Sequence, residues 1–231
     1  EASPPSAVEV KPVICVVGGG GRMVALAASG NQYIAEQVVV AVPPSVWDRI
    51  RLVPPLPANL RPQMGPDIKY LAQVKRPFWA DEKLSADALT DGDISMTWDA
   101  TQGQEGRGAP PGAVLTSFSG GPAAEHIRAK QPLDRDAFYR SELDKIFPGF
   151  SQNLLSSRFM DWPSEMWTNA GYSFPAPRQI TTIGRALFDG LPGIQFCGEH
   201  TSYAFPGYME GALSSGVALA KRIAQKDNVA R

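Results

Sequence analysis

The sequence predicts a mixed α/β fold of the α+β kind, divided into two sub-domains. Short runs of β-branched and aromatic residues recur along the chain between glycine-rich or proline-rich turns, which is typical of strands. Amphipathic helical patterns are fewer, and the two clearest cover 134–146 and 208–224. A proline-rich stretch at 45–60 separates one group of predicted strands from the next, and it indicates an irregular crossing between sub-domains.

Composition places the chain among globular proteins and argues against several partners. With 231 residues, of which 43% are hydrophobic, the chain can build a substantial core. A formal net charge of −1 argues against nucleic acid as a partner. No apolar stretch approaches the ~20 residues of a transmembrane segment. The two cysteines, Cys15 and Cys197, lack the spacing of a zinc site or a disulfide framework, so we expect both to be buried as small apolar residues.

The first sub-domain begins, after a loose tail at 1–10, with a series of β patterns. We predict strands at 13–17, 23–26 and 33–42, joined by glycine-rich turns at 18–21 and 29–31. The four glycines at 18–21 follow a strand, as a phosphate-binding loop would. An apolar strand rather than a helix comes after them, so we interpret them as a hairpin turn. The segment 38–42 is apolar on both faces, which predicts a strand covered on both sides of a sheet.

A second group of strands follows the proline-rich crossing. These strands are predicted at 68–79, 94–98 and 114–118, with a glycine- and proline-rich loop at 102–112. A helix should begin with Asp134 as its N-cap and end before Pro148-Gly149. His126 is expected on the surface of a helical stretch.

The C-terminal part predicts a strand at 193–198, a tight loop and a helix at 208–224. Gly211 and Gly216 would each cost about 1 kcal/mol relative to alanine in that helix. We therefore expect another part of the structure to press close to both. A strand, a loop and a glycine-bearing helix in this order form a natural seat for an anion or a cofactor. Glu210 is expected to serve the electrostatics of the helix N-terminus.

The loop and helix carry the most specific motif in the chain. The segments 196–201 (Phe-Cys-Gly-Glu-His-Thr) and 207–212 (Gly-Tyr-Met-Glu-Gly-Ala), followed by Ser215-Gly216, resemble the C-terminal FAD signature of the flavin amine oxidase family. This family includes monoamine, polyamine and L-amino-acid oxidases. The resemblance implies backbone contacts with the FAD pyrophosphate and ribityl at the first glycine and its neighbour, and a helix whose positive end points at the flavin. The positions implied as cofactor contacts are Gly198, Glu199, Gly207, Tyr208 and Met209.

A second segment, 64–69 (Met-Gly-Pro-Asp-Ile-Lys), is followed by Pro-Phe-Trp at 77–79. It is similar to the family segment in which a lysine reaches toward flavin N5 through a water. The resemblance therefore implies that role for Lys69.

Two more segments match the family in the same order along the chain. Asp161-Trp162 with 169–173 is similar to the stretch that carries a tryptophan near the flavin and one tyrosine of an aromatic cage. This implies these roles for Trp162 and Tyr172, with Tyr208 as the second cage tyrosine. The segment 12–44 is similar to the part that passes the adenine, which implies a contact at Val13.

The chain departs from the family in two respects. Gly171 stands where monoamine oxidases bear the cysteine that bonds covalently to FAD, so the cofactor is expected to be held non-covalently. The N-terminal Rossmann segment with its G-x-G-x-x-G motif is absent. We therefore expect a second chain that carries this half, packed over a large apolar surface as a hetero-oligomer. The first residue is Glu1 rather than methionine, which suggests a processed chain or a fragment, and the sequence leaves the compartment open.

The resemblance implies a domain division and a reaction. Residues 1–58 and 165–231 would form part of a split, Rossmann-like FAD-binding domain, and 59–164 a substrate-binding domain with a mixed sheet flanked by helices. The reaction would be oxidation of an amine to an imine and then an aldehyde, with O2 reduced to hydrogen peroxide. Its catalytic residues would be Lys69, Tyr172 and Tyr208.

Two other functions stay open at this point. The chain could belong to an L-amino-acid oxidase, since the arginine that would hold a substrate carboxylate lies outside this half in relatives. It could also be a non-catalytic structural subunit that has lost FAD. Among single residues, we interpret Trp167 as core and His200 as an ordinary loop histidine.

Overall fold

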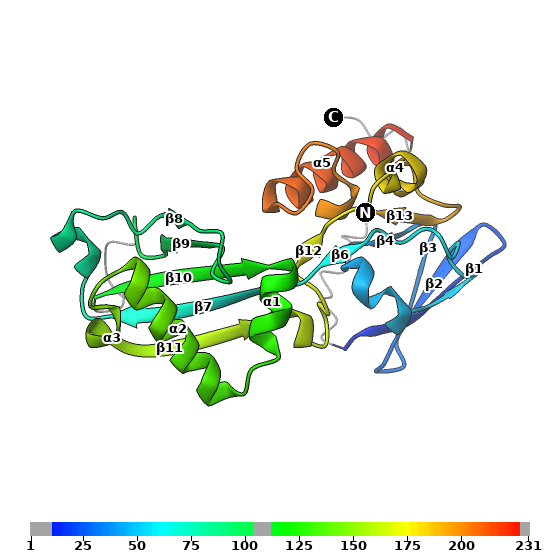
Figure 1. Cartoon of the computed structure of the whole chain (residues 1–231). Helices are drawn as coiled ribbons and strands as arrows, with labels where there is room; N and C mark the ends of the chain where they lie inside the picture. Colours follow the sequence, from blue (N-terminus) through cyan, green and yellow to red (C-terminus); the bar gives the residue numbers. More distant parts are fainter. Residues whose placement is uncertain (1–10, 104–111, 227–231) are drawn as a thin grey trace. The chain divides into compact units, whose positions relative to one another are not determined.

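The computed structural model describes residues 11–103 and 112–226. The chain forms two compact units (Figure 1). The terminal unit contains Glu1–Met64 and Tyr172–Arg231, and the central unit contains Gly65–Gly171. The sequence places the divisions at 58/59 and 164/165, whereas the units divide at 64/65 and 171/172. The predicted tail at 1–10 and most of the predicted loop at 102–112 lie outside the described residues.

The first sheet of the terminal unit has the strand order β3-β2-β1-β5. Its strands are β1 (Val13–Gly19), β2 (Arg22–Ala27), β3 (Gln32–Ala35) and β5 (Arg51–Val53). β1 and β2 form an antiparallel hairpin, and Gly20 and Gly21 turn the chain with φ values of 59° and 78°. The interpretation of the glycine run as a hairpin turn is confirmed. The stretch expected to be irregular contains η1 (Pro44–Arg49) and β5, which pairs parallel to β1.

The strand predicted at 33–42 is broken into two strands that join different sheets. Its first half is β3, and its second half, β4 (Val38–Val40), pairs parallel to β13 (Ile194–Phe196). The expectation that this segment is covered on both faces is wrong for the described chain, because Val39 is 43% exposed. Among the described residues β4 and β13 form a two-stranded sheet, and Val39 lies on the face opposite to buried Val40.

The core of the terminal unit lies between these strands and α4 (Gln179–Asp189), a helix that the sequence analysis does not predict. Trp47 from η1 packs on Phe196 from β13, with ring centroids 5.1 Å apart. Ile183 and Leu187 of α4 join this cluster. The prediction of two buried cysteines is wrong, since Cys15 and Cys197 are both half-buried thiols. The residue next to each cysteine along the strand is fully buried, and it takes the inward-facing position instead of the cysteine.

The central unit is built on a five-stranded sheet with the order β11-β7-β10-β9-β8. The strands are β7 (Asp67–Val74), β8 (Ala88–Leu89), β9 (Met96–Asp99), β10 (Ala113–Gly120) and β11 (Leu154–Asp161). Neighbouring strands pair antiparallel throughout. The sequence analysis misses β11. It also extends β7 too far, because the strand ends at Val74 and Phe78-Trp79 lie in η2 (Phe78–Glu82).

One face of this sheet carries α1 (Gly121–Arg128), α2 (Pro132–Ile146) and α3 (Phe150–Asn153), as Figure 1 shows. Alternate residues of β7 point to these helices, and Tyr70 stacks on Tyr139 of α2 with ring centroids 4.0 Å apart. α2 begins at Pro132 with Gln131 as its cap, so Asp134 lies in the first turn rather than at the N-cap. The other residues of β7, among them Asp67 and Lys69, point to the opposite face.

The last helix, α5 (Met209–Lys226), contains two glycines with different surroundings. A Cβ on Gly211 would overlap the carbonyl oxygen of Phe205 and lie 2.9 Å from its carbonyl carbon. A Cβ on Gly216 would meet nothing within 4 Å among the described residues. The expected close approach therefore exists at Gly211, whereas at Gly216 nothing in the described chain approaches.

These surroundings predict opposite effects for the same substitution. Gly211→Ala is expected to lower the free energy of unfolding by roughly 1–3 kcal/mol, because the added methyl has no room. Gly216→Ala is expected to raise it by up to about 1 kcal/mol, since alanine is the better helix former. Urea unfolding of both variants beside the parent protein checks this. Equal effects of the two substitutions would contradict the close packing at Gly211.

Among residues 11–103 and 112–226, no helix has both the length and the apolar character needed to cross a membrane.

Candidate active site

The strand, turn and helix predicted as a cofactor seat are present in the terminal unit. β13 ends at Phe196, Gly198 follows with φ 138°, and η4 (Glu199–Thr201) precedes the turn into α5. A Cβ on Gly198 would lie 2.5 Å from Cε1 of His200, so the position admits only glycine. The Gly198 amide N–H donates to Ser215 Oγ at 2.9 Å. This N–H is therefore used within the protein, in contrast to the cofactor contact that the sequence implies for it.

The carboxylate of Glu199 also turns toward the protein. Its Oε1 accepts a hydrogen bond from the Ser173 amide at 2.8 Å. Its Oε2 accepts one from Ser173 Oγ at 2.6 Å and one from the Gly207 amide at 2.6 Å. Glu199 thereby links β12 (Tyr172–Ser173) to the turn before α5. Sequence reasoning gives no role to Ser173, a buried residue that enters it only as the last position of the segment 169–173.

The two predicted cage tyrosines adjoin the segments that Glu199 links. Tyr172 immediately precedes Ser173, and Tyr208 immediately follows Gly207. Gly207 has φ 81°, and a Cβ on it would lie 3.2 Å from Cδ2 of Tyr172. Tyr208 and Met209 are 68% and 91% exposed, so the start of α5 presents its backbone and these side chains to a ligand. The structure thus brings Tyr172, Glu199 and Gly207 together.

His200 is a buried residue rather than the ordinary loop histidine expected from the sequence. It is 9% exposed, its ring meets Trp47 edge-on at 5.7 Å, and its Nε2 has no hydrogen-bond partner among the described residues. Burial lowers the pKa of His200 to about 4, and the charge of Glu199 opposes this only partly. The ring is therefore neutral near pH 7, and it fills the space beside Gly198.

Two other predicted residues of the chain are placed as follows. Val13 begins β1, opposite Ala27 in the first sheet, and is half-buried. The interpretation of Trp167 as a core residue is wrong, because Trp167 is 52% exposed. It lies in the irregular segment between η3 (Trp162–Ser164) and β12.

In the central unit, Lys69 lies in β7 on the face that the helices do not cover. Its register partners are Phe118 on β10 and Met160 on β11. Its Nζ lies 5.8 Å from the centroid of the Trp98 ring. Asp67 is two residues away on the same strand face and only 5% exposed. Burial raises the pKa of Asp67, and the positive charge of Lys69 opposes that effect.

Gly171 lies against Asp67. Its amide N–H donates to the Gly65 carbonyl at 2.9 Å. A Cβ on Gly171 would overlap Oδ1 of Asp67 and lie 2.5 Å from its Cγ. Sequence reasoning does not single out Asp67, although aspartate is uncommon in strands and this one begins β7.

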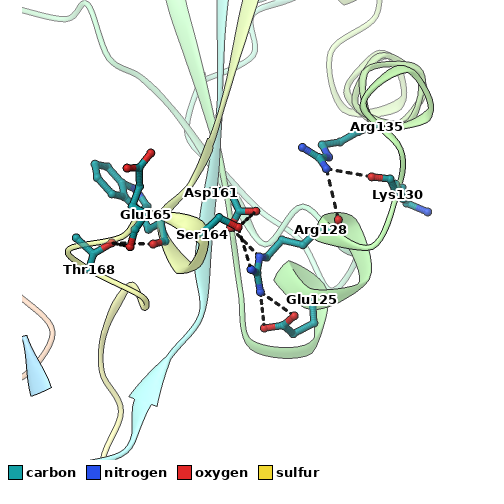
Figure 2. A network of polar contacts seen from close by, with 9 residues as sticks. Glu125, Arg128, Lys130, Arg135, Asp161, Ser164, Glu165 and Thr168 are labelled. Carbon is teal, nitrogen blue, oxygen red and sulfur yellow. Dashed lines mark hydrogen bonds and ion pairs between the residues drawn. The ribbon is translucent and has the colours of Figure 1, made fainter. Parts of the chain in front are cut away.

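Trp162 is held by a polar network at the end of β11, drawn in Figure 2. Asp161, the last residue of β11, accepts a hydrogen bond from Arg128 Nε at 2.7 Å and one from Ser164 Oγ at 2.8 Å. The carbonyl of Trp162 accepts one from Thr168 Oγ1 at 2.7 Å. Arg128 also pairs with Glu125 at 2.9 Å. The network sets the start of η3 (Trp162–Ser164), and Trp162 itself is half-buried.

Lys69, Trp162 and Gly171 lie near one end of the central sheet. β7 starts where β11 ends, with Asp161 opposite Ile68, and Gly171 contacts Asp67 at the first position of β7. Apart from Val13 in the first sheet, the predicted residues therefore form two sets, one at the seat in the terminal unit and one at this end of the central sheet. The two sets are joined through the chain, because Tyr172 directly follows Gly171.

Comparison with known proteins gives the family context of these sets. Residues 8–224 match the family described as flavin containing amine oxidoreductase. A probable flavin-containing monoamine oxidase A from Dictyostelium discoideum is 28% identical over 225 residues, which are 93% of this chain and 48% of that protein. An L-amino acid dehydrogenase from Synechocystis sp. is 29% identical over 200 residues, covering 84% of this chain and 41% of that protein. The human flavin-containing amine oxidase B is 27% identical over 226 residues, which cover 92% of this chain and 42% of that protein.

Solved structures share the fold. Cyclohexylamine oxidase from Brevibacterium oxydans matches with a TM-score of 0.82 at 24% identity, over 94% of this chain and 48% of that one. Wild-type putrescine oxidase bound to putrescine matches with a TM-score of 0.82 at 23% identity, over 93% of this chain and 48% of that one. The predicted mixed α/β fold is confirmed. The chain spans about half the length of the proteins that it matches.

Proposed function

We propose that this chain, which belongs to the flavin containing amine oxidoreductase family, supplies the carboxyl-terminal part of an FAD-dependent amine oxidase. The reaction is oxidation of an amine to an imine, with O2 as the acceptor and hydrogen peroxide as a product. The observation that carries the proposal is the seat in the terminal unit, where Glu199 links the segments of the two cage tyrosines beside the start of α5.

Family membership implies FAD as the cofactor, and the residues of the seat fit it. A Cβ at Gly198 or Gly211 would collide with neighbouring atoms, and Gly207 has a φ that favours glycine, so the turn consists of bare backbone. Bare backbone next to a helix N-terminus suits close approach of a cofactor with negative charge. α5 has 18 residues, so its first turn carries the partial positive charge of a long helix.

FAD, when bound, accepts a hydride equivalent from the carbon next to the amine nitrogen and passes electrons on to oxygen. The chain's own residues bind and orient the substrate. Tyr172 and Tyr208 direct their ring faces at a neutral amine and align its nitrogen. Lys69 holds a water and supplies a positive charge where the reduction of oxygen develops negative charge.

The remaining predicted residues contact the cofactor. Trp162 flanks the flavin, and Val13 lies by the adenine. Gly198, Glu199, Gly207 and Met209 line the seat, with Glu199 acting through its N–H since its carboxylate is used internally. The N–H groups of Gly198 and Gly207 donate within the protein, so these two glycines serve by leaving room for the cofactor. At Gly171 the neighbouring Asp67 leaves no room for a side chain, which supports non-covalent binding of FAD.

We further propose that the terminal unit is the FAD-binding domain and the central unit the substrate-binding domain. A second chain that carries the N-terminal Rossmann half would cover the terminal unit. Two observations support this. β4 and β13 form a parallel pair without further strands, whereas parallel sheets are otherwise covered on both faces. Along α5, Met209, Leu213 and Val217 form an exposed apolar stripe at helical spacing.

An L-amino-acid oxidase or dehydrogenase is the second candidate, because one relative of the chain is named an L-amino acid dehydrogenase. An amine and the α-amino acid with the same side chain distinguish the two substrate classes. Measuring hydrogen peroxide separately from reduction of an artificial electron acceptor distinguishes an oxidase from a dehydrogenase.

Purification of the chain together with the polypeptide that carries the Rossmann half, followed by a visible spectrum, tests the proposal. We expect a yellow complex whose flavin bands bleach when an amine is added without oxygen. A stable, colourless protein that does not take up added FAD would instead favour a structural subunit.

A further inference from the structure

The Glu199 side chain forms hydrogen bonds with both segments that carry the cage tyrosines. Ser173 and Gly207 are 34 positions apart in the sequence, and both donate to one carboxylate. The three donor to acceptor distances are 2.6 to 2.8 Å, which is the range of charge-assisted hydrogen bonds. A carboxylate that already accepts three hydrogen bonds from the protein is poorly suited to accept a proton from a substrate.

The donors of these hydrogen bonds directly adjoin the tyrosines. Ser173 is 3% exposed and follows Tyr172, so its position determines where β12 directs the Tyr172 side chain. Gly207 precedes Tyr208, and a Cβ on Gly207 would lie 3.2 Å from Cδ2 of Tyr172. Other hydrogen bonds in the turn are longer, such as the Phe205 amide to Ser202 Oγ at 3.1 Å and the Tyr208 amide to the Phe205 carbonyl at 3.3 Å. Loss of the carboxylate would leave three donors without an acceptor and would free the turn from β12.

We propose that Glu199 is a positioning residue that sets the spacing of Tyr172 and Tyr208, and that it thereby controls amine affinity rather than retention of FAD. This inference rests on the proposed function for the role of the two tyrosines. The link itself is a property of the terminal unit alone, and it can be measured without substrate or cofactor.

The first measurement is hydrogen–deuterium exchange of the protein and of the Glu199→Gln variant. Glutamine has the same length as glutamate, but its side-chain amide nitrogen would face a hydrogen-bond donor and cannot accept a hydrogen bond. We expect at least about tenfold faster exchange in the peptides that contain Ser173 and Gly207, as for an amide that loses a buried hydrogen bond. Glu36→Gln changes an exposed glutamate of the same unit and should leave both peptides unchanged. Unchanged exchange in Glu199→Gln would overturn the inference, whatever the activity of the protein.

The second measurement uses the FAD-loaded complex and benzylamine as the probe. We expect Glu199→Gln to keep its FAD content and to need about ten- to a hundredfold more benzylamine for half-saturation of flavin bleaching. Ser173→Ala loses one donor and keeps both backbone bonds, so a smaller shift in the same direction is expected. This variant also serves as the test if Glu199→Gln does not fold. Loss of FAD with unchanged benzylamine affinity would make Glu199 a cofactor ligand and would refute the inference.

If neither the parent complex nor the variants bind FAD, the proposed function fails while the exchange result still decides the link.

Discussion

Replacement of Lys69 by methionine is expected to slow the reaction of the reduced complex with oxygen by about a hundredfold, while the reaction with amine slows much less. Methionine retains the length and packing beside Trp98 but removes the positive charge. A preorganised charge next to developing negative charge contributes on the order of a hundredfold in rate. Rapid mixing of the complex with amine, and separately of the reduced complex with oxygen, measures the two reactions.

Two controls make the Lys69 result specific. Lys145→Met removes an exposed lysine on α2, whose ion pair with Glu142 lies on the surface, and should change neither rate. Lys69→Arg keeps the charge and should retain most of the reaction with oxygen. Equal slowing of both reactions in Lys69→Met would refute the proposed role and would point to a general loss of geometry.

Gly171→Ala is expected to lower the free energy of unfolding by roughly 1–3 kcal/mol, and Asp67→Ala in the same chain should relieve most of that loss. The added methyl would overlap Oδ1 of Asp67, and Asp67 is too deeply buried in β7 to turn into solvent. Gly171 has no positive φ, so the clash with Asp67 is the source of the penalty. Urea unfolding of the two single variants and the double variant measures the coupling.

A matched glycine of the central unit serves as the reference for Gly171. A Cβ on Gly92 would lie 3.5 Å from Thr90 Oγ1, an ordinary contact, so Gly92→Ala should be close to neutral. If Gly171→Ala lowers the free energy of unfolding by the same amount with and without Asp67→Ala, Asp67 does not exclude a side chain at position 171. The same geometry predicts that Gly171→Cys, without a change at Asp67, places no thiol in the position it has in monoamine oxidases.

Local features of the sequence were predicted well. The glycine hairpin, the strand before Gly198 and the helix that begins near Tyr208 depend on residues close together in the chain, so patterns and turn chemistry determine them. The same holds for the position of Gly211, where glycine in a helix correctly indicated a close neighbour.

Features that depend on distant partners were missed. The segment 33–42 reads as one strand, but β3 pairs with β2 while β4 pairs with β13, some 155 residues further along the chain. β11 has a mixed polar pattern because it is an edge strand whose residues 155–158 are exposed, and pairing with β7 is what makes it a strand. His200 was assigned to a loop because nothing near it in sequence reveals that Trp47 covers its ring.

The sequence by itself determined which residues are candidates for the site and which family they resemble, because glycines at turns and aromatic residues at fixed spacing are local signals. Only the tertiary structure decided what several of those residues do. In the folded chain the Glu199 carboxylate accepts hydrogen bonds from Ser173 and Gly207. The Gly198 amide donates to Ser215, and Asp67 packs against Gly171. Hydrogen bonds and steric contacts between distant segments depend on how the chain packs, and packing is not encoded in the spacing of any one motif.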